Sequence, residues 1–444
     1  MWGEGFISGA VRYFFALLTF LSASLAADKP NFVVFLIDDL GATDLGCYGS
    51  KFYETPHLDQ LAKDGMRFRT AYSACTVCSP TRAAMLTGKY PARLRITDWI
   101  AGHVRPNAPL QIPDWVKALP TDEWTVASGL RGAGYATCAI GKWHLSPGGP
   151  AAHGFDVAIA DNGRGQPATY LAPFKNPNLS DGPDGEELTA RCTSEAIKFI
   201  STNADKPFFV YLPHFAVHTP LGGKKEDIAR FALKENPQGK PAYAAMIKAV
   251  DDSVGRIRAE LEKLGLSEKT VLIFTGDNGG LELGKVTDNL GVRAGKGSAY
   301  EGGVRVPLIV RWPGVTKAGT ETDIPAITPD IPATLAEAAG LEKRAFDGVS
   351  LMPVLGRGKF AERPLFWHYP HYHPGGATPY SAIREGDFRL VHFYEDERDE
   401  LYHLASDPEE KEDLATKNVG KAKDLRAKLD RWLKETGAQL PTRK

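Results

Sequence analysis

Two pairs of polar residues follow apolar segments of this chain and are candidates for a metal site. Asp38 and Asp39 follow one segment, and Asp277 and Asn278 follow another. Three carboxylates and one amide oxygen form an all-oxygen set, which suits a hard cation such as calcium or magnesium better than zinc. One such pair alone would more often belong to a turn or a helix cap. Two pairs, each after its own apolar segment, favour a metal ion.

A cysteine stands at the start of a segment that is typical of a helix N-terminus. Cys78 is followed by Ser79, which can cap a helix, and by Pro80, which is favoured at a first helical position. Backbone N–H groups and the helix dipole favour an anion there, so the position favours a thiolate. Cys75 leaves another interpretation open: the two cysteines could form a disulfide or half of a metal site, although no second such pair completes a zinc site.

Two lysines and two histidines add cations and a proton donor. Lys142 and His144 are two residues apart after an apolar segment, so in an extended chain they would point the same way. Lys296 stands between two glycines, in a loop expected to be flexible enough to bring its ammonium to an anion. His218 precedes Thr-Pro, in a loop suited to a proton donor. Taken singly, each is as often a surface or structural residue.

Four segments are predicted to be buried strands, because they are short apolar or β-rich runs without alternation. Apolar residues at helical spacing run from Met246 to Leu264, and Gly265 then supplies a stop. Strands that alternate with helices predict an α/β fold with a mostly parallel sheet flanked by helices. Ligands gather at the carboxyl ends of such strands, where the candidate residues stand. The four segments are residues 32–37, 135–140, 207–212 and 270–274.

The pattern changes after about Asp347. Strand-like segments follow in quick succession at 364–369, 380–384 and 388–393, with a turn expected at 385–387. A helix with one apolar face closes the chain. We therefore predict a small C-terminal antiparallel sheet with one helix. The predicted division is a signal peptide at 1–26, a large domain at 27–346 and a C-terminal α+β subdomain at 347–444.

The N-terminus has the features of an export signal. Arg12 precedes an apolar run from Tyr13 to Leu25, which ends in the small-x-small pattern that a signal peptidase accepts. The run is too short for a comfortable transmembrane helix. The sequence favours export, to a periplasm or outside the cell, without stable membrane insertion after cleavage. An uncleaved anchor is the alternative.

Charge and cysteine content narrow the classes of partner. The 444 residues include 53 Lys and Arg against 54 Asp and Glu, a formal net charge of −1. That balance gives no field to attract nucleic acid or an anionic membrane, so any anion must be bound locally. Five cysteines are an odd number for an exported chain, which flags one with a separate task. If that one is Cys78, the pairing of four others stays open: Cys47, Cys75, Cys138 and Cys192.

The segment around Cys78 resembles a known family. Cys78-Ser-Pro-Thr-Arg82, followed by Ala-Ala-Met-Leu-Thr-Gly88, resembles the sulfatase signature that directs oxidation of the cysteine to formylglycine. The segment from Gly134 to Leu145 resembles the second sulfatase signature. The two signatures together are highly specific, and the resemblance covers nearly the whole mature chain in the expected order. Further matches lie at Asp277-Asn-Gly279, Lys296, Tyr300 to Pro307, Glu400-Leu-Tyr402 and Asp407-Pro408.

The resemblance implies an alkaline-phosphatase-like catalytic domain and the hydrolysis of sulfate esters. It implies that a formylglycine-generating enzyme converts Cys78 during maturation and that Arg82 anchors the product. His144 would pair with the formylglycine hydrate, and His218 would protonate the departing alcohol. The two lysines that would grip the sulfate oxygens are Lys142 and Lys296. The side chains that would hold one calcium ion are Asp38, Asp39, Asp277, Asn278 and the modified Cys78.

The substrate class follows from the same resemblance and from the predicted export. Both favour sulfated carbohydrates, such as galactose or N-acetylgalactosamine sulfates. Residues of two segments are candidates to contact the sugar, although ordinary surface loops are the alternative. These candidates are Asp98, Trp99, His103 and Arg105 in the first segment and His371-Tyr372-His373 in the second.

Two rival functions remain open at this point. A phosphatase or phosphodiesterase on the same scaffold would need a Ser or Thr nucleophile and further His ligands for two zinc ions, and His144 and His218 do not make a convincing second site. A secreted protein that binds sulfated glycans with Cys78 unmodified would use the same lysines and turn nothing over.

Overall fold

The structure is a computed structural model of the chain, and it describes residues 29–145 and 148–444. The predicted signal peptide, residues 1–26, lies outside these ranges. Across the described ranges, no helix combines the length and the apolar character that crossing a membrane requires.

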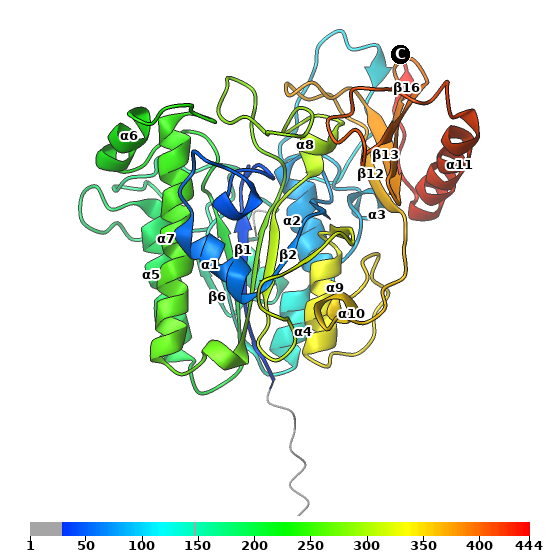
Figure 1. The fold of residues 1–444 in the computed structure, drawn as a ribbon. Coiled ribbons are helices and arrows are strands. Elements are labelled where there is room, and N and C mark those ends of the chain that lie inside the picture. The colour runs from blue at the N-terminus through cyan, green and yellow to red at the C-terminus, as the bar shows by residue number, and fades with distance from the viewer. Residues whose placement is uncertain (1–28, 146–147) are drawn as a thin grey trace, which may run out of the picture.

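An eight-stranded sheet forms the centre of the molecule (Figure 1). In order across the sheet, the strands are β10 (Thr320–Thr322), β2 (Met66–Phe68), β9 (Leu308–Arg311), β8 (Thr270–Gly276), β1 (Asn31–Ile37), β7 (Phe208–His214), β5 (Ala136–Ile140) and β6 (Val157–Ile159). β1 pairs in parallel with β7 and β8, and β5 pairs in parallel with β7 and β6. β9 runs antiparallel to β8 and β2. The predicted mostly parallel sheet is confirmed, with all four expected strands in it.

Helices cover both faces of this sheet (Figure 1). On one face, α5 (Leu188–Thr202) and α7 (Pro241–Lys263) pack on the strands. On the other face lie α2 (Cys78–Thr87), α4 (Val126–Gly132) and α9 (Asp330–Ala338). α7 contains most of the predicted 246–264 helix. The doubly covered sheet is what buries strands of continuous apolar sequence.

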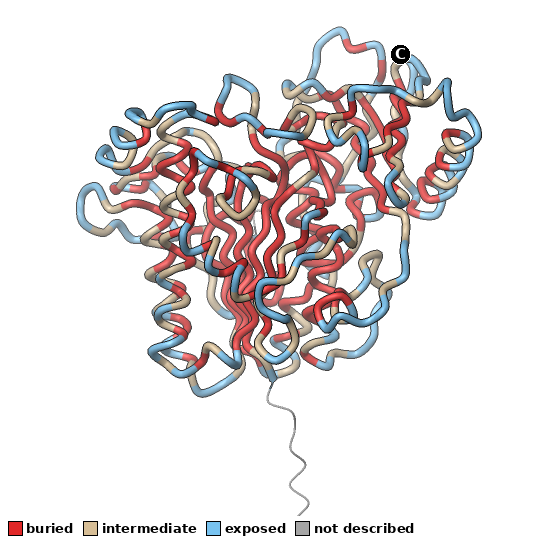
Figure 2. Tube along the Cα trace, viewed as in Figure 1, coloured by how far each residue is buried: buried red, intermediate tan, exposed pale blue. Residues whose placement is uncertain are grey.

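The central strand β1 divides its side chains between two hydrophobic cores. Phe35 and its alternate neighbours pack under α5 and α7, whereas Val34 and its alternate neighbours pack under α2, α4 and α9. The period of two in a strand sends successive side chains to opposite faces. All seven residues of β1 are buried, and Figure 2 shows the sheet as the buried centre of the molecule. The strand ends are thereby held in fixed positions.

A second, four-stranded antiparallel sheet follows near the C-terminus. Its strands are β12 (Leu365–Tyr369), β13 (Tyr380–Glu385), β14 (Phe388–Phe393) and β15 (Arg398–His403), in that order. α11 (Val419–Thr436) packs against it. The three predicted strands, their turn and the closing helix are confirmed. β15 escaped prediction because it is an edge strand whose sequence, Arg-Asp-Glu-Leu-Tyr-His, is mostly polar.

The small sheet shares a core with the segment that precedes α2. The Trp367 indole N–H donates to the carbonyl of Ser73 at 2.9 Å, and its ring packs edge-on against Tyr72, with centroids 5.2 Å apart. Tyr90, beside α3 (Pro91–Leu94), packs on Trp432 of α11. The C-terminal sheet therefore supports the segment that carries Cys78. The boundary at 346/347 stays a prediction.

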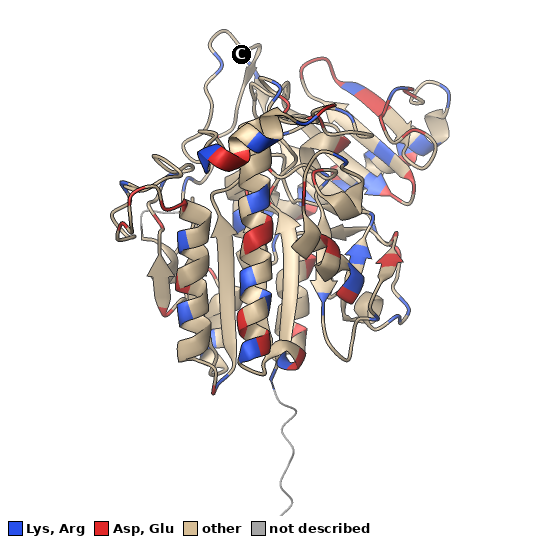
Figure 3. Ribbon diagram, turned by 60° about the vertical axis from the view of Figure 1, so that its left-hand side comes forward, with Lys and Arg blue, Asp and Glu red and all other residues tan. Residues whose placement is uncertain are grey.

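Shorter elements complete the chain. β3 (Ala71–Tyr72) pairs in parallel with β11 (Ala326–Ile327). β4 (Leu110–Gln111) pairs antiparallel with β16 (Thr442–Arg443), which ties the C-terminus to the loop before α4. All five cysteines are free thiols in the structure. Figure 3 shows both signs of charge mixed along the helices, consistent with the balanced composition. The remaining elements are η1 (Gly46–Tyr48), α1 (Pro56–Asp64), η2 (Pro150–His153), α6 (Lys225–Ala232), η3 (Ser267–Lys269), α8 (Glu301–Val304) and α10 (Met352–Leu355).

Candidate active site

The predicted site residues meet at the carboxyl ends of four adjacent strands. Asp38 and Asp39 follow β1, Lys142 follows β5, His218 follows β7 and Asp277 follows β8. These four strands are neighbours in the order β8-β1-β7-β5. Their carboxyl ends face upward in Figure 1 and bring residues more than 200 positions apart in the sequence into contact.

A buried acidic cluster lies at the centre of this group. Asp38, Asp39, Asp277 and Asn278 are all buried. The Asp39 backbone N–H donates to Asp277 Oδ1 at 3.2 Å, and the Asn278 amide donates to Asp39 Oδ1 at 2.8 Å. Asp39 has a φ of 60°, the left-handed region that non-glycine residues seldom occupy. That turn lies against the end of β8, where Asp39 contacts Asp277 and Asn278.

Two lysines contact separate carboxylates of the cluster. Lys142 donates to Asp38 Oδ2 at 2.5 Å, with both side chains fully buried. Lys296 contacts both oxygens of Asp39, at 2.7 and 2.9 Å. Each ammonium thus lies beside the acidic cluster, where it can also reach an anion bound next to it.

Arg82 contacts the third carboxylate. Its Nε and Nη2 both donate to Asp277 Oδ2, at 2.9 and 2.7 Å, and its Nη1 donates to the carbonyl of Lys142 at 2.8 Å. Nη2 also lies 3.8 Å from Asp38 Oδ1. Because Arg82 belongs to α2, this contact fixes the helix that carries Cys78 against the ends of β5 and β8.

The carboxylates differ in how well their charge is compensated. Burial, and then the nearby Asp277 carboxylate, raise the pKa of Asp38 well above its usual range, in spite of Lys142. Burial acts in the same direction on Asp39, but the charge of Lys296 holds the pKa of Asp39 below its usual range. Asp38 is therefore the carboxylate that would gain most from a further cation.

The donor set fits a hard metal ion. Asp38 Oδ1 and Asn278 Oδ1 are buried and accept no hydrogen bond, although buried polar atoms in proteins nearly always have a partner. Ligand atoms of Asp38, Asp39 and His218 lie within 4.8 Å of one another. Two unpartnered oxygens beside two further carboxylates are the kind of oxygen-rich surroundings that calcium takes in proteins.

Cys78 stands at the first position of α2 and faces His144. Its Sγ lies 3.2 Å from His144 Nδ1, and the side chain is buried. The predicted cap is wrong: the helix begins at Cys78 with Val77 as its N-cap, and no side chain caps it. Ser79 donates to the His144 carbonyl at 2.9 Å instead, because the loop after β5 crosses directly above the helix start. The predicted place of Cys78 at a helix N-terminus is correct.

His144 reaches the site by a route different from the predicted one. Its φ of 57° shows that the chain is not extended there, so the alternation argument for Lys142 and His144 is wrong although both side chains reach the site. Its Nε2 contacts the carbonyl of Ile100. A carbonyl only accepts, so Nε2 carries the proton and Nδ1 offers a lone pair toward Cys78. Burial, and then Lys142, lower the pKa of His144 well below its usual range, which keeps the ring neutral.

The loop that carries Lys296 is packed rather than flexible, which corrects the prediction. The N–H of Lys296 donates to the carbonyl of Gly280 at 2.9 Å, and that of Gly297 donates to the carbonyl of Thr76 at 3.0 Å. A Cβ on Gly295 would lie 2.3 Å from the carbonyl oxygen of Gly280. The two glycines allow this loop to pack closely against the backbone of Gly280 and Thr76, and this packing fixes the position of Lys296.

His218 faces Asp39 from the loop after β7. Its Nδ1 lies 2.7 Å from the carbonyl of Thr219, so Nδ1 carries a proton, and Nε2 points to Asp39 Oδ2 at 3.7 Å. Burial, and then the charge of Lys296, lower the pKa of His218 to about 3. The ring is therefore neutral until another anion enters the site.

One residue of His371-Tyr372-His373 lies next to Lys296: a Cβ on Gly297 would meet the ring of His373. Burial, and then the charge of Lys296, lower the pKa of His373 to about 4, whereas the charge of Asp39 raises it. His371 is fully buried and contacts Thr97 Oγ1 at 2.8 Å, so it has a structural place. Of the two histidines, His373 is the one that lies near the candidate site.

The Asp98–Arg105 segment is only partly exposed. Asp98 is buried and accepts hydrogen bonds from the backbone N–H groups of Trp99 and His103, at 2.9 and 3.3 Å, so it shapes the loop. His103 is half-buried, and Arg105 is exposed with its guanidinium 5.0 Å from the ring centre of Tyr372. Trp99 packs against the core of the C-terminal sheet, so of the four candidates in this segment His103 and Arg105 are the two left to contact a ligand.

One residue that the sequence did not signal also contacts the site. The Tyr243 hydroxyl lies 3.0 Å from the backbone carbonyl of Asp39 and 2.6 Å from Asp44 Oδ2. Tyr243 comes from α7, 204 positions away, and nothing in its surrounding helical pattern distinguishes it from a core residue.

Comparison with known proteins identifies the family. The family model described as Sulfatase matches residues 30–341, most of the chain. The chain belongs to the sulfatase family. A second model, the C-terminal part of N-sulphoglucosamine sulphohydrolase, matches residues 295–439 of this sulfatase.

Curated relatives and solved structures agree with this assignment. The N-acetylgalactosamine-6-sulfatase of Sus scrofa is 35% identical over 382 residues, which cover 78% of this chain and 70% of the relative. A protein named Sulfatase from Formosa agariphila is 32% identical over 502 residues, 93% of this chain and 90% of the relative. The crystal structure of Ps i-CgsB in complex with k-i-k-neocarrahexaose superposes with a TM-score of 0.78 at 30% identity, covering 91% of this chain and 93% of that one. This sulfatase is a sulfuric ester hydrolase, and its predicted alkaline-phosphatase-like fold is confirmed.

Proposed function

We propose that this sulfatase releases inorganic sulfate from sulfated carbohydrates, with a formylglycine made from Cys78 as nucleophile and one calcium ion as cofactor. The observation that carries the proposal is the convergence of Cys78, two lysines and two histidines on one buried oxygen-rich cluster. That set contains a nucleophile position, anion-binding cations, a base and an acid, which are the parts that ester hydrolysis requires.

The proposed ligands of calcium are Asp38, Asp39, Asp277, Asn278 and the modified Cys78. The ion would supply Lewis-acid polarisation of the nucleophile and of the sulfate, and the hydrated formylglycine would supply two hydroxyls, one to attack sulfur and one whose deprotonation would expel sulfate afterwards. Lys142 and Lys296 bind the sulfate oxygens, and Arg82 holds α2 in register with the cluster. Their fixed positive charges stabilise the charge that develops on the transferring group.

The two histidines divide the proton transfers. The lone pair of His144 Nδ1 points at the side chain of residue 78, so this ring orients the nucleophile and accepts its proton. His218 turns Nε2 into the site, and a bound sulfate ester raises its pKa from the low value that burial sets. Protonated in that complex, Nε2–H donates to the leaving alcohol oxygen.

The proposed substrates are galactose or N-acetylgalactosamine sulfates, cleaved by exo action. Support comes from the relatives named N-acetylgalactosamine-6-sulfatase and from the solved structure bound to k-i-k-neocarrahexaose. The sugar would be contacted by His373, His103 and Arg105. His373 Nδ1 accepts the N–H of Gly375 at 2.9 Å, so the neutral ring carries its proton on Nε2 and offers a donor to a sugar or sulfate oxygen.

The proposal extends to maturation and location. A formylglycine-generating enzyme would convert Cys78, and cleavage of residues 1–26 would accompany export to a periplasm or out of the cell. The catalytic domain would comprise residues 27–346, and the C-terminal subdomain residues 347–444. A protein that binds sulfated glycans with Cys78 unmodified is the alternative, since the same lysines would serve it.

Sulfate release separates the two functions. The protein is produced together with a formylglycine-generating enzyme and incubated with sulfated galactose and N-acetylgalactosamine, and free sulfate is measured. We expect catalytic release from the wild type and none from Cys78→Ala, which lacks the nucleophile. Binding of the same sugars without release, by both proteins, would support the binding function instead.

A further inference from the structure

Near the acidic cluster lies a further buried carboxylate with a complete set of donors. Asp44, in the turn after β1, is fully buried. Its Oδ1 accepts from Thr287 Oγ1 and Gln238 Nε2, each at 3.0 Å. Its Oδ2 accepts from the N–H of Gly41 at 3.0 Å and lies 2.6 Å from the Tyr243 hydroxyl. A carboxylate can accept about four hydrogen bonds, so this one has no free capacity for a ligand or an ion.

Hydrogen-bond donors face both oxygens of Asp44, so the position suits a carboxyl group and not an amide. Gly41 N–H and Gln238 Nε2 cannot reverse their polarity in place, and they face different oxygens of Asp44. Gln238 is held in this orientation because its Oε1 accepts from Ser50 Oγ at 2.7 Å and its Nε2 also donates to the carbonyl of Asp288 at 3.1 Å. An asparagine at this position would set its NH2 group against one of those donors, and a buried unpaired donor costs on the order of 1–3 kcal/mol.

The Tyr243 hydroxyl links this carboxylate to the metal site. It bridges Asp44 Oδ2 at 2.6 Å and the backbone carbonyl of Asp39 at 3.0 Å. Asp39 has a φ of 60°, a conformation that persists only where its surroundings hold it. The bridge is therefore a support for the turn that presents Asp39 to Lys296 and to the ligand oxygens.

The two contacts share one hydroxyl proton. With Asp44 ionised, Tyr243 satisfies only one of its two acceptors fully. With Asp44 protonated, its carboxyl O–H donates to Tyr243, and Tyr243 donates to the carbonyl of Asp39, so each atom has a partner. Burial raises the pKa of Asp44 to about 6, in the direction that this arrangement favours.

We propose that Asp44 and Tyr243 are positioning residues that hold the backbone of Asp39 in the geometry for calcium binding. Neither touches the ion or the substrate; they act through Asp39. The inference rests on the proposed function, because it requires that the Asp39 carboxylate binds the metal. Residues that orient metal ligands change metal affinity or activity by about 10- to 100-fold when they are removed.

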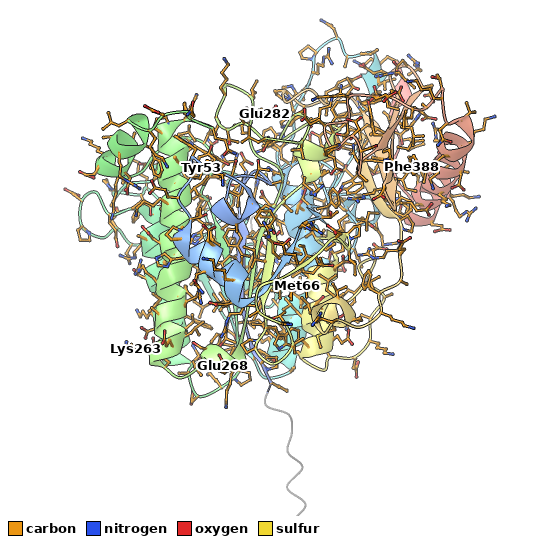
Figure 4. All side chains as sticks on the ribbon, in the orientation of Figure 1. Tyr53, Met66, Lys263, Glu268, Glu282 and Phe388 are labelled. Carbon is orange, nitrogen blue, oxygen red and sulfur yellow. The ribbon has the colours of Figure 1, made fainter. Side chains whose placement is uncertain are left out.

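The chain offers a matched pair of variants for the test. Tyr243→Phe removes only the hydroxyl that bridges Asp44 and Asp39. Tyr53→Phe removes a hydroxyl from the same network, since Tyr53 OH lies 2.8 Å from Thr287 Oγ1, but it leaves Asp39 untouched. Tyr53 is buried and packs edge-on against Tyr243, with ring centroids 5.6 Å apart, so the two substitutions disturb the same core. Figure 4 labels Tyr53 beside the upper end of α7.

Calcium affinity is measured by titration calorimetry on chelator-treated full-length protein, with the unfolding temperature of the metal-free proteins as a check on folding. We expect Tyr243→Phe to weaken calcium binding about 10- to 100-fold and Tyr53→Phe to leave it within about threefold. Equal calcium affinity in Tyr243→Phe and the wild type would overturn the inference, as would equal weakening in both variants. A wild type that binds no calcium would contradict the proposed calcium cofactor itself, a result distinct from both.

Discussion

Arg82 donates two hydrogen bonds to one oxygen of Asp277, and neither side chain reaches solvent. The pair joins the start of α2 to the end of β8, so it fixes Cys78 relative to the acidic cluster. A buried pair of this kind is less a source of net stability than a constraint, because desolvation opposes the attraction of the charges.

Removing Arg82 should destabilise the fold and not only the activity. Arg82→Met leaves Asp277 buried without its partner, which typically costs about 3–5 kcal/mol. Urea unfolding monitored by circular dichroism measures this directly. The matched control is Arg230→Met, which breaks an exposed pair with Glu54 and should change stability by less than about 1 kcal/mol. Similar small changes in both variants would contradict the structural role assigned to Arg82.

The loss of rate on substitution of His218 should depend on the leaving group of the substrate, whereas the loss on substitution of Lys296 should not. His218→Gln removes the proposed proton donor, so kcat on a sugar sulfate should fall about 10²- to 10⁴-fold, with a smaller loss on 4-nitrophenyl sulfate, whose phenolate leaves without a proton. Lys296→Gln removes a sulfate contact common to both substrates and should lower both rates alike. Equal losses on the two substrates in His218→Gln would count against its role as the acid.

Substitutions at the proposed sugar contacts should impair activity on the sulfated glycan but not on a small aryl sulfate. Arg105→Ala and His373→Ala should raise KM for the true sulfated glycan, because they remove contacts to the sugar and not to the reacting sulfate. Activity on 4-nitrophenyl sulfate should change little. Steady-state kinetics on both substrates test this, and equal losses on both would remove these residues from sugar recognition.

Calcium should stabilise the folded protein. A ligand that binds only the folded state adds about 2.7 kcal/mol at one hundred times its dissociation constant. The unfolding temperature of chelator-treated protein should therefore rise with added calcium. Asn278→Ala, which deletes an oxygen that accepts no hydrogen bond, should shift this rise to higher calcium concentration. If the unfolding temperature of the wild type did not change with calcium concentration, the result would contradict the metal site.

Asp98 should make stability depend on pH. Burial raises the pKa of Asp98 to about 7, in spite of hydrogen bonds from Tyr369 and the backbone. The folded state then binds the proton more tightly than the unfolded state, so this contribution is complete below about pH 4 and is lost as the pH rises through 7, up to roughly 4 kcal/mol. Urea unfolding of Asp98→Asn between pH 4 and 8 should show a flatter profile than the wild type. Parallel profiles would contradict the raised pKa.

The chemistry of the site was readable from the sequence because strand ends concentrate it. Asp38, Lys142 and Asp277 each stand directly after a continuous apolar run, and parallel strands bring such positions to one edge. Backbone detail was not readable. The left-handed turns at Asp39 and His144, and the close packing around Lys296, depend on tertiary contacts that no local pattern reveals.

Contacts between residues far apart in the sequence could not be predicted either. In the sequence, Tyr243 is indistinguishable from the other core positions of its helix. Its hydroxyl contacts the Asp39 carbonyl only because α7 packs beside the end of β1. The Ser79 cap failed for the same reason, since the His144 carbonyl competes for its hydroxyl. β15 was missed because an edge strand needs apolar residues on one face at most.

The most direct test of the proposed mechanism is the mass of the peptide that contains Cys78, from protein produced with a formylglycine-generating enzyme. The mechanism predicts that the thiol is replaced by an aldehyde or its hydrate, and that the modified fraction parallels the rate of sulfate release. An unmodified Cys78 in protein that still releases sulfate would contradict the formylglycine nucleophile. An unmodified Cys78 without sulfate release, under conditions that modify a control sulfatase, would contradict the proposed maturation.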